Sequence, residues 1–350
     1  MRRETGAIIS KGAATLHRTS RFAWKTRFGE CCLKGVRLMS ILGVMALLVL
    51  PPPGDNKGLT SFSQVALAQS PPFHYGVKVE MVDVYATVHN RAGKLVTRLN
   101  ENDFVIFDNG IPQAISQFSR DYIPLSVLIL LDTSGSMAGK KLENAKRSLI
   151  QFLKRLNHGD EAMLMTFRSR PRIVQSFTQD MDKIKQGLRR LEGDGSTALY
   201  DAILTGLDQI RQSHNRRRTL LLISDGINTY GRTQLKDTIE VLRARGVELF
   251  AIGIEEAFPQ DARDRIVTRS VLDQLTGSAG GESFVISDAR DLGDICHNIS
   301  DQMHHQYSLG YYVPKVKETG WHDIRIETKV PGLTVIPSKM GYYPSAPPSR

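Results

Sequence analysis

The chain has 350 residues, a length that suits one large domain or two smaller ones. Hydrophobic residues make up 41% of it, which is normal for a globular core and excludes a disordered or fibrous protein. The formal net charge of +10 suggests a nucleic acid or an anionic membrane as partner, but residues 1–68 hold ten Lys or Arg against three Asp or Glu, a net +7 of that charge. The remaining residues carry too little excess positive charge for a nucleic-acid surface, so we expect no nucleic-acid partner.

Residues 1–68 have the parts of an export leader. A basic stretch precedes the apolar run LMSILGVMALLVL (38–50), and the triplet ALA at 66–68 fits a signal peptidase site. An uncleaved anchor is the alternative, although the run is shorter than the roughly 20 residues that span a bilayer. Met39 is an alternative start. We expect export to the periplasm, the cell envelope or the medium, with membrane contact only through this leader if it is not removed.

Residues 69–123 are predicted to form a small β-sandwich-like module. Short stretches of alternating apolar and polar residues, such as VKVEMVDVYATV from residue 77, are separated by turns rich in Asn, Gly and Pro. Residues 307–350 return to short strands and are too few for a separate domain. We therefore expect them to pair with the module of residues 69–123.

Residues 124–306 alternate buried strands with amphipathic helices. The predicted strands are LSVLILLD (125–132), EAMLMTF (161–167), RIVQSF (172–177, at an edge), TLLLIS (219–224), VELFAIGI (247–254) and ESFVIS (282–287). The predicted helices cover residues 141–156, 181–191, 198–210, 234–245, 268–276 and 291–306. This order predicts an α/β fold with a doubly wound, mainly parallel sheet, whose binding sites lie beyond the carboxyl ends of the strands.

Oxygen-bearing side chains follow two of these buried strands. Asp132, Ser134 and Ser136 come at and after the end of LSVLILLD, whereas Asp225 follows TLLLIS. Thr197 precedes a predicted helix and lies in the same edge of the predicted sheet. Two carboxylates and three hydroxyls, without histidine or thiolate, suit Mg²⁺, Mn²⁺ or Ca²⁺ rather than zinc or copper.

This order of residues resembles a known metal site. The pattern Asp-x-Ser-x-Ser, then a distant Thr, then a distant Asp is similar to the metal-ion-dependent adhesion site of von Willebrand factor type A (VWA) domains. The resemblance covers about residues 124–306. The segment NENDFVIFDNGIPQAISQF before it and YSLGYYVP after it resemble a group of exported bacterial VWFA-related domain proteins.

The resemblance implies a role for each residue of the pattern. Ser134, Ser136 and Thr197 would ligate the cation directly, whereas Asp132 and Asp225 would hold bound water and supply negative charge. A cation held mainly by neutral hydroxyls keeps an open position, and a carboxylate of a protein or peptide partner can complete its coordination shell. In this family ligation can be coupled to a displacement of the last helix, which in this chain is the helix of residues 291–306.

Three functions are compatible with these features. The leading hypothesis is an exported, divalent-cation-dependent protein that binds an acidic group of a protein partner in adhesion or assembly. A second is a structural envelope protein whose β modules do the binding. The third, a metal-assisted hydrolase, is disfavoured because the sequence has no GxSxG, HExxH, GxxxxGK or Cys-His arrangement. We therefore expect a protein that is not an enzyme.

Residues outside this pattern have structural interpretations. The run Arg216-Arg217-Arg218 precedes a buried strand and is predicted to be a solvated loop rather than an anion site. Cys296 is predicted to be a small buried side chain on a late helix. Asp201 is predicted to lie near the metal site or on a helix surface without ligating a metal.

Overall fold

The structure is a computed structural model that describes residues 81–225, 228–254, 262–288, 290–313 and 320–344. The chain divides into two units, Met1–Phe73 and His74–Arg350, and every described element belongs to the second. The leader predicted for residues 1–68 lies outside the described residues. Within the described ranges, no helix combines the length and the apolar character needed to cross a membrane.

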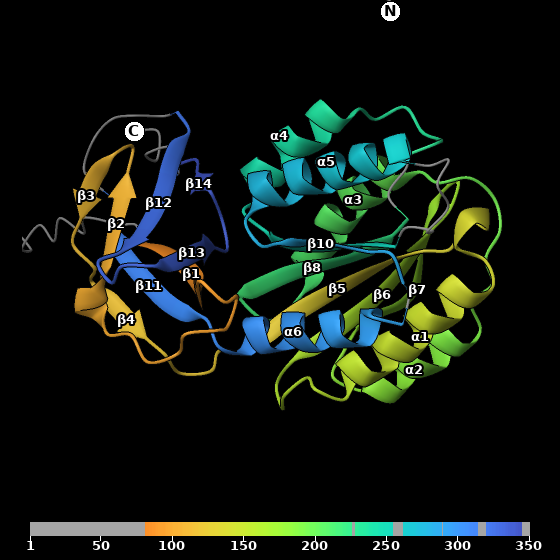
Figure 1. The fold of residues 1–350 in the computed structure, drawn as a ribbon, viewed down its shortest axis with the longest axis horizontal. Helices are drawn as coiled ribbons and strands as arrows, with labels where there is room; N and C mark the ends of the chain where they lie inside the picture. The colour runs from red at the N-terminus through yellow and green to blue at the C-terminus, as the bar shows by residue number, and fades with distance from the viewer. Residues whose placement is uncertain (1–80, 226–227, 255–261, 289, 314–319, 345–350) are drawn as a thin grey trace, which may run out of the picture. The chain divides into compact units, whose positions relative to one another are not determined.

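A six-stranded sheet forms the centre of the α/β part, in the order β10-β9-β8-β5-β6-β7 (Figure 1). Neighbouring strands are parallel except for the edge strand β7, which is antiparallel to β6. The strands are β5 (Leu125–Asp132), β6 (Glu161–Phe167), β7 (Pro171–Thr178), β8 (Arg217–Ser224), β9 (Glu248–Ile254) and β10 (Ser283–Ile286). The predicted doubly wound α/β fold is confirmed.

Helices cover both faces of this sheet (Figure 1). One face carries α1 (Lys140–Leu153), α2 (Met181–Arg189) and α6 (Leu292–His304), and the other carries α3 (Leu199–Gln209), α4 (Leu235–Arg245) and α5 (Ala262–Ala279). In β5, Val127 and Ile129 join the core beneath α1, whereas Leu128 and Leu130 join the core beneath α3. Because both faces of the strand are buried, residues 127–131 are all apolar and the sequence shows no alternation.

Helix α5 extends further toward its amino terminus than the predicted helix of residues 268–276. Ile266 and Val267 lie within it and are exposed, so these two apolar residues do not continue the buried face of the helix. The helical period was therefore absent from that stretch of sequence. Three short 3₁₀ helices complete the helical elements: η1 (Glu101–Asp103), η2 (Gly135–Met137) and η3 (Ile210–Gln212).

The β part is a sandwich of two four-stranded sheets, in the orders β13-β1-β11-β4 and β14-β12-β2-β3. Its strands are β1 (Met81–Asn90), β2 (Phe104–Asp108), β3 (Ile111–Gln113), β4 (Gln117–Ser119), β11 (Tyr307–Tyr312), β12 (His322–Thr328), β13 (Leu333–Pro337) and β14 (Gly341–Tyr342). Val84 and Leu309 from one sheet share a core with Ile106 and Ile324 from the other. The predicted flanking β-sandwich is confirmed.

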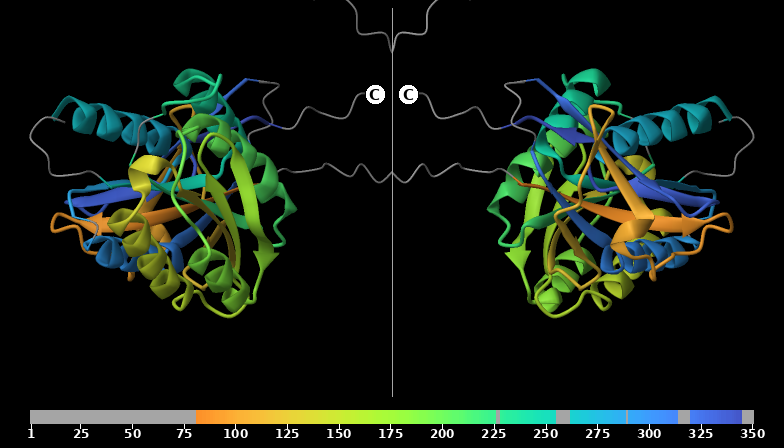
Figure 2. Two further views of the ribbon diagram at one scale, coloured as in Figure 1. Left: turned by 90° about the vertical axis from the view of Figure 1, so that its right-hand side faces the viewer. Right: turned by 90° about the vertical axis from the view of Figure 1, so that its left-hand side faces the viewer.

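The strands of this sandwich come from two distant segments of the chain. Strand β1 pairs with β11, so that Val84 lies opposite Leu309, and β2 pairs with β12, so that Ile106 lies opposite Ile326. In the right-hand view of Figure 2, orange strands of the first segment lie beside blue strands of the second. The β-sandwich is therefore built jointly from strands that precede the α/β part and strands that follow it.

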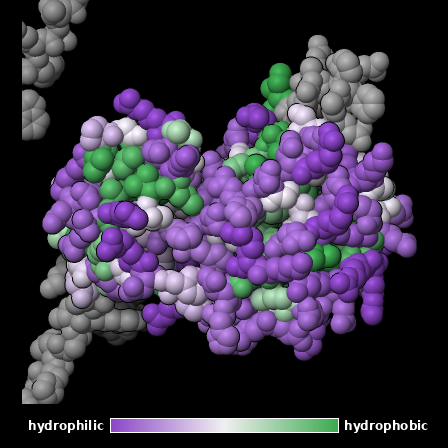
Figure 3. Space-filling model, turned by 60° about the horizontal axis from the view of Figure 1, so that its bottom comes forward, coloured by the Kyte–Doolittle hydropathy of each residue, from purple (hydrophilic) through white to green (hydrophobic). Residues whose placement is uncertain are grey.

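The surface of the α/β part is largely hydrophilic on the face drawn in Figure 3. A cluster of hydrophobic side chains lies on the β part, at the left of the same view. Ile111 and Tyr312 are among the large apolar side chains that are exposed.

Candidate metal centre

The side chain of Asp132 links strands β5 and β8 at the carboxyl edge of the sheet. Asp132 is the last residue of β5 and its side chain is buried. Its Oδ1 accepts a hydrogen bond from the backbone N–H of Ser134 at 2.8 Å, and its Oδ2 accepts one from Ser224 Oγ, at the end of β8, at 2.6 Å. The carboxylate therefore lies at the point where the strand order reverses, which is the place where such sheets bind ligands.

The two serines of the pattern lie side by side after β5. Ser134 Oγ and Ser136 Oγ are 3.0 Å apart, and Ser134 is buried whereas Ser136 is exposed. The N–H of Gly135 between them donates to the carbonyl oxygen of Gly195 at 2.8 Å. Ser134 therefore lies at the buried carboxylate of Asp132, whereas Ser136 is open to solvent.

The loop that contains Thr197 is bonded to both neighbouring loops. Asp194 N–H donates to the carbonyl oxygen of Thr133 at 2.9 Å. Thr197 N–H donates to Thr229 Oγ1 at 2.9 Å, and the N–H groups of Thr229 and Tyr230 donate to the carbonyl oxygen of Thr197. Thr197 itself is buried. The structure thus brings all three segments of the predicted site together.

Asp225 lies next to a lysine that the sequence interpretation missed. Lys141 Nζ is 3.7 Å from Asp225 Oδ2 and donates a hydrogen bond to the carbonyl oxygen of Ser136 at 3.1 Å. Both side chains are mostly buried, with exposed fractions of 14% and 12%. Lys141 lies in the first turn of α1, the helix that follows the serine loop. That position is the signal from which the contact could have been predicted.

Asp201 supports the loop that follows β8. It accepts a hydrogen bond from Thr233 Oγ1, and it lies one helical turn after Thr197. Gly231 has φ +108, and a Cβ there would lie 2.6 Å from Asp201 Oδ2. A side chain at position 231 would therefore collide with the carboxylate as well as strain the backbone.

The electrostatics of the centre favour a cation. Burial raises the pKa of Asp132 to about 6, although hydrogen bonds from Ser224 and Ser134 oppose the shift and the charge of Asp225 adds to it. A buried carboxylate held in this way gains stability from a positive charge placed beside it.

The donor set determines which cation fits. It consists of carboxylate and hydroxyl oxygens, which are the ligands of hard divalent cations. In the described part of the chain, no group of three or more His, Cys, Asp or Glu side chains could hold a metal ion. By their chemistry alone, the carboxylate and hydroxyl oxygens of the candidate centre fit Mg²⁺, Mn²⁺ or Ca²⁺ better than zinc or copper.

Comparison with known proteins identifies the α/β part. Residues 126–298 match the family model of the von Willebrand factor type A domain. The chain therefore contains a VWA domain. The match begins at the second residue of β5 and ends within α6, so it includes all three segments of the candidate metal centre.

Curated relatives of the VWA domain match over part of their length. The inter-alpha-trypsin inhibitor heavy chain H1 of Sus scrofa is 28% identical over 150 residues, which are 38% of this chain and 16% of that protein. Heavy chain H4 of Bos taurus is 27% identical over 127 residues, or 33% of this chain and 14% of that protein. An uncharacterized Synechocystis protein is 30% identical over 112 residues, 31% of this chain and 27% of that one. The chain thus spans about a quarter or less of these relatives.

Solved structures that resemble the chain include other VWA proteins. A von Willebrand factor type A protein from Catenulispora acidiphila has a TM-score of 0.47 and 12% identity, covering 77% of this chain and 76% of that one. BatB from Bacteroides thetaiotaomicron has a TM-score of 0.42 and 19% identity, covering 51% of this chain and 98% of that one.

Proposed function

We propose that this VWA protein is an exported, divalent-cation-dependent binding protein that captures an acidic group of a protein or peptide partner. The observation that carries the proposal is the convergence of three segments at one edge of the sheet. Asp132, Ser134 and Ser136 come from the first segment, and the Thr197 loop and the region of Asp225 are bonded or salt-bridged to it or to one another.

The residues of the centre have two proposed roles, namely direct ligation of the cation and supply of negative charge. Ser134, Ser136 and Thr197 are the proposed direct ligands, and Asp132 and Asp225 balance the charge through bound water. A divalent cation held mainly by neutral hydroxyls keeps excess positive charge and an open position, which a carboxylate of the partner fills. Ser136 is exposed, so the partner reaches this position from solvent.

Binding rather than catalysis suits this arrangement. Hydrolysis at a metal centre needs a general base within reach of the activated water. Both oxygens of Asp132 already accept hydrogen bonds, from Ser134 and Ser224, and the carboxylate is buried. The charge on Asp225 is shared with Lys141. Neither carboxylate is therefore well placed to remove a proton from water.

The proposed location of the protein and its proposed biological role rest on the sequence. The basic and apolar stretches within residues 1–68 support export, and the acidic partner is proposed to belong to an adhesion or assembly system of the cell envelope. The leader is the proposed point of membrane contact if it is retained.

Calorimetric titration of the full chain with Mg²⁺ and Mn²⁺ tests the proposal. We expect saturable binding by the wild type and a loss of at least about tenfold in affinity when Ser134 and Ser136 are both changed to alanine, because two of the proposed ligands are gone. Ser176→Ala is the matched control, because Ser176 is an exposed serine on β7. Absence of saturable binding in folded wild-type protein would overturn the proposal.

A peptide titration tests the acidic partner separately. With saturating Mg²⁺ we expect an aspartate-containing peptide to bind and its asparagine counterpart to bind at least about tenfold more weakly, because the open position takes a charged oxygen. Equal binding of the two peptides, or binding that persists after the metal is removed, would contradict capture through the cation. In that case the β-sandwich would be the binding part.

A further inference from the structure

A second concentration of charge lies at the opposite end of the central sheet. Here the amino-terminal ends of β8 and β9 meet the β part around a pocket of about 310 Å³. We call it the basic pocket, because five cationic side chains line it, namely Arg216, Arg217, Arg218, Arg245 and Lys339. Among the described residues, two acidic side chains, Asp83 and Glu248, lie in the same wall. The lining therefore carries an excess of positive charge.

The prediction of a solvated loop at Arg216-Arg217-Arg218 is wrong for Arg218, which lies in β8 and is half-buried, and above all for Arg217. This residue is the first of β8 and only 4% exposed. Its guanidinium lies over the ring of Tyr85 at 5.3 Å from the centroid, and its Nη2 donates to Gln306 Oε1 at 2.6 Å. Its Nε is buried and has no hydrogen-bond partner. A buried cation with an unsatisfied donor is costly, and nearby negative charge offsets that cost.

The two acidic side chains of the basic pocket already interact with cations of its lining. Burial raises the pKa of Glu248, a shift that the charge of Arg217 and the hydrogen bonds from Gln306 and Thr219 only partly oppose. Asp83 faces Lys339, where burial lowers the pKa of the ammonium and Asp83 offsets this shift only in part. The lining thus has five cationic side chains against these two acids, which leaves an excess of positive charge.

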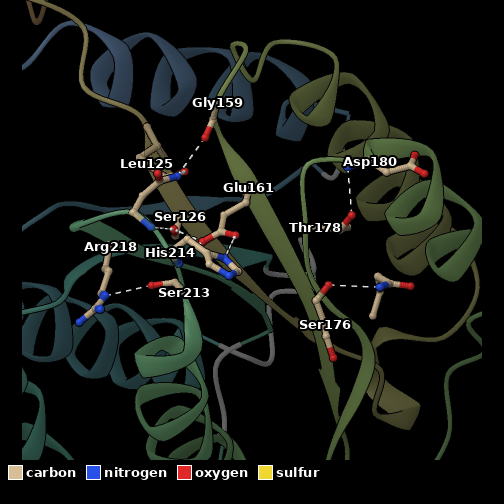
Figure 4. Close-up of polar contacts among 12 residues, drawn as sticks. Leu125, Ser126, Gly159, Glu161, Ser176, Thr178, Asp180, Ser213, His214 and Arg218 are labelled. Atoms are coloured by element: carbon tan, nitrogen blue, oxygen red, sulfur yellow. Dashed lines mark hydrogen bonds and ion pairs between the residues drawn. The ribbon is translucent and has the colours of Figure 1, made fainter.

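The remaining cations differ in how firmly they are held. Arg218 Nε donates to Ser213 Oγ at 2.9 Å (Figure 4), and Arg245 pairs with Asp208 at 2.8 Å. Arg216 is exposed, and it forms no ion pair within 4.0 Å among the described residues. Lys339 packs its side-chain stem against Gly246. Lys339 also forms no ion pair within 4.0 Å among the described residues, so Arg216 from the α/β part and Lys339 from the β part are the cations of the lining that are left to bind a ligand.

We propose that the basic pocket binds a multiply charged oxyanion, a phosphate or sulfate group, through Lys339 and Arg216. Guanidinium groups present paired donors that match such oxygens, and an ammonium adds a point charge. A concave site lined by one sign of charge concentrates its field and favours ions of higher opposite charge. The bound anion would join residues of both parts of the structure at their junction. The site is separate from the metal centre and does not depend on the function proposed for it.

Calorimetric titration of the metal-free full chain with inorganic phosphate, with sulfate and with acetate tests this site. The metal is removed by a chelating resin, because a soluble chelator is itself a polyanion that would compete. We expect saturable binding of phosphate or sulfate and much weaker binding of acetate. Phosphate and sulfate both match the cationic lining of the pocket. A preference for one of them in the titration therefore shows which of the two anions the site binds.

Variants locate the binding. Lys339→Gln and Arg216→Gln should each weaken the oxyanion about tenfold, the loss that accompanies one charge-assisted contact. Arg243→Gln removes an equal charge from the exposed surface of α4 and should leave the affinity unchanged. Ser134→Ala in the metal centre should also leave it unchanged, which separates the two sites. Thermal unfolding confirms that each variant folds.

Two results would overturn the inference. One is the absence of saturable binding of phosphate and sulfate by the folded wild type. The other is binding that Lys339→Gln and Arg216→Gln weaken no more than Arg243→Gln does, because this would mean a diffuse response to net charge.

Discussion

Lys141 Nζ lies 3.7 Å from Asp225 Oδ2 and donates a hydrogen bond to the carbonyl oxygen of Ser136. The ammonium therefore joins the first and third segments of the candidate metal centre, from the first turn of α1. A divalent cation at the same centre would be repelled by this charge and would have to share Asp225 with it. The lysine is thus placed to set how tightly the centre holds a metal ion.

Replacing Lys141 with glutamine should tighten Mg²⁺ binding by roughly tenfold, because a like charge is removed from beside the site. The gain should shrink at high salt, because dissolved ions screen the same repulsion. Lys140→Gln removes the neighbouring, exposed lysine and should have little effect. Calorimetric titration of the three proteins with Mg²⁺ checks this. Weaker binding by Lys141→Gln would mean that the lysine organises the loop instead.

Gly193→Ala should disturb the loop that contains Ser134 and Ser136, because Gly193 lies against the end of that loop. A Cβ at Gly193 would lie 2.8 Å from Ala138 Cα, which follows η2, so one of the two backbones must shift. We expect weaker Mg²⁺ binding and a loss of about 1–3 kcal/mol in the free energy of unfolding. Gly277→Ala on α5 meets no atom within 4 Å and should be neutral or mildly stabilising. Unchanged metal affinity in Gly193→Ala would show that the loop adapts without cost.

Asp160 should make the protein sensitive to acid. Its carboxylate accepts hydrogen bonds from Leu125 N–H at 2.9 Å, Asn157 N–H at 2.8 Å and the Tyr122 hydroxyl, and it lies 3.2 Å from His304 Nε2. Burial alone would raise the pKa of Asp160, but the contacts with His304, Leu125 and Tyr122 outweigh it and hold this pKa below its usual value.

The direction of this shift fixes the direction of the pH effect. A carboxyl pKa that is lower in the folded state stabilises the fold at neutral pH, and this stabilisation is lost as pH falls from about 4 through the folded-state pKa. Asp160→Asn should lower the free energy of unfolding at pH 7 by about 1–3 kcal/mol and should flatten its decline toward pH 2. Urea unfolding over a pH series measures both effects. Exposed Asp323→Asn should change neither, and an equally steep acid decline in Asp160→Asn would assign the sensitivity to other groups.

Cys296 should be inert in the folded protein. It is buried on α6, and burial raises the pKa of its thiol to about 12, so very little reactive thiolate is present near neutral pH. Iodoacetamide should label it at least about a hundredfold more slowly in native protein than in urea. Mass spectrometry of the peptide that contains Cys296 separates it from Cys31 and Cys32. Rapid native labelling would mean that α6 leaves the sheet readily.

Local patterns were sufficient for the elements around the metal centre. The unbroken apolar run of residues 127–131 predicted a strand buried on both faces, and the spacing in residues 141–156 predicted an amphipathic helix. The polar residues after the strands predicted that these segments lie together, because parallel strands end at one edge of a sheet. They did not predict Lys141, whose contact with Asp225 depends on how α1 is packed after the loop.

The sequence by itself determined the alternation of strand and helix, the order of the oxygen-bearing residues and, through them, the VWA family. Only the tertiary structure decided that Arg217 is buried beside Tyr85 and Gln306, although its neighbours in the chain are charged. Hydrophobic periodicity reports which face of an element is buried by its own sheet or helix layer. It gives no information about which distant residues pack against the end of that element. The basic pocket arises from such a meeting of residues far apart in the chain, so its charge became visible only in the folded structure.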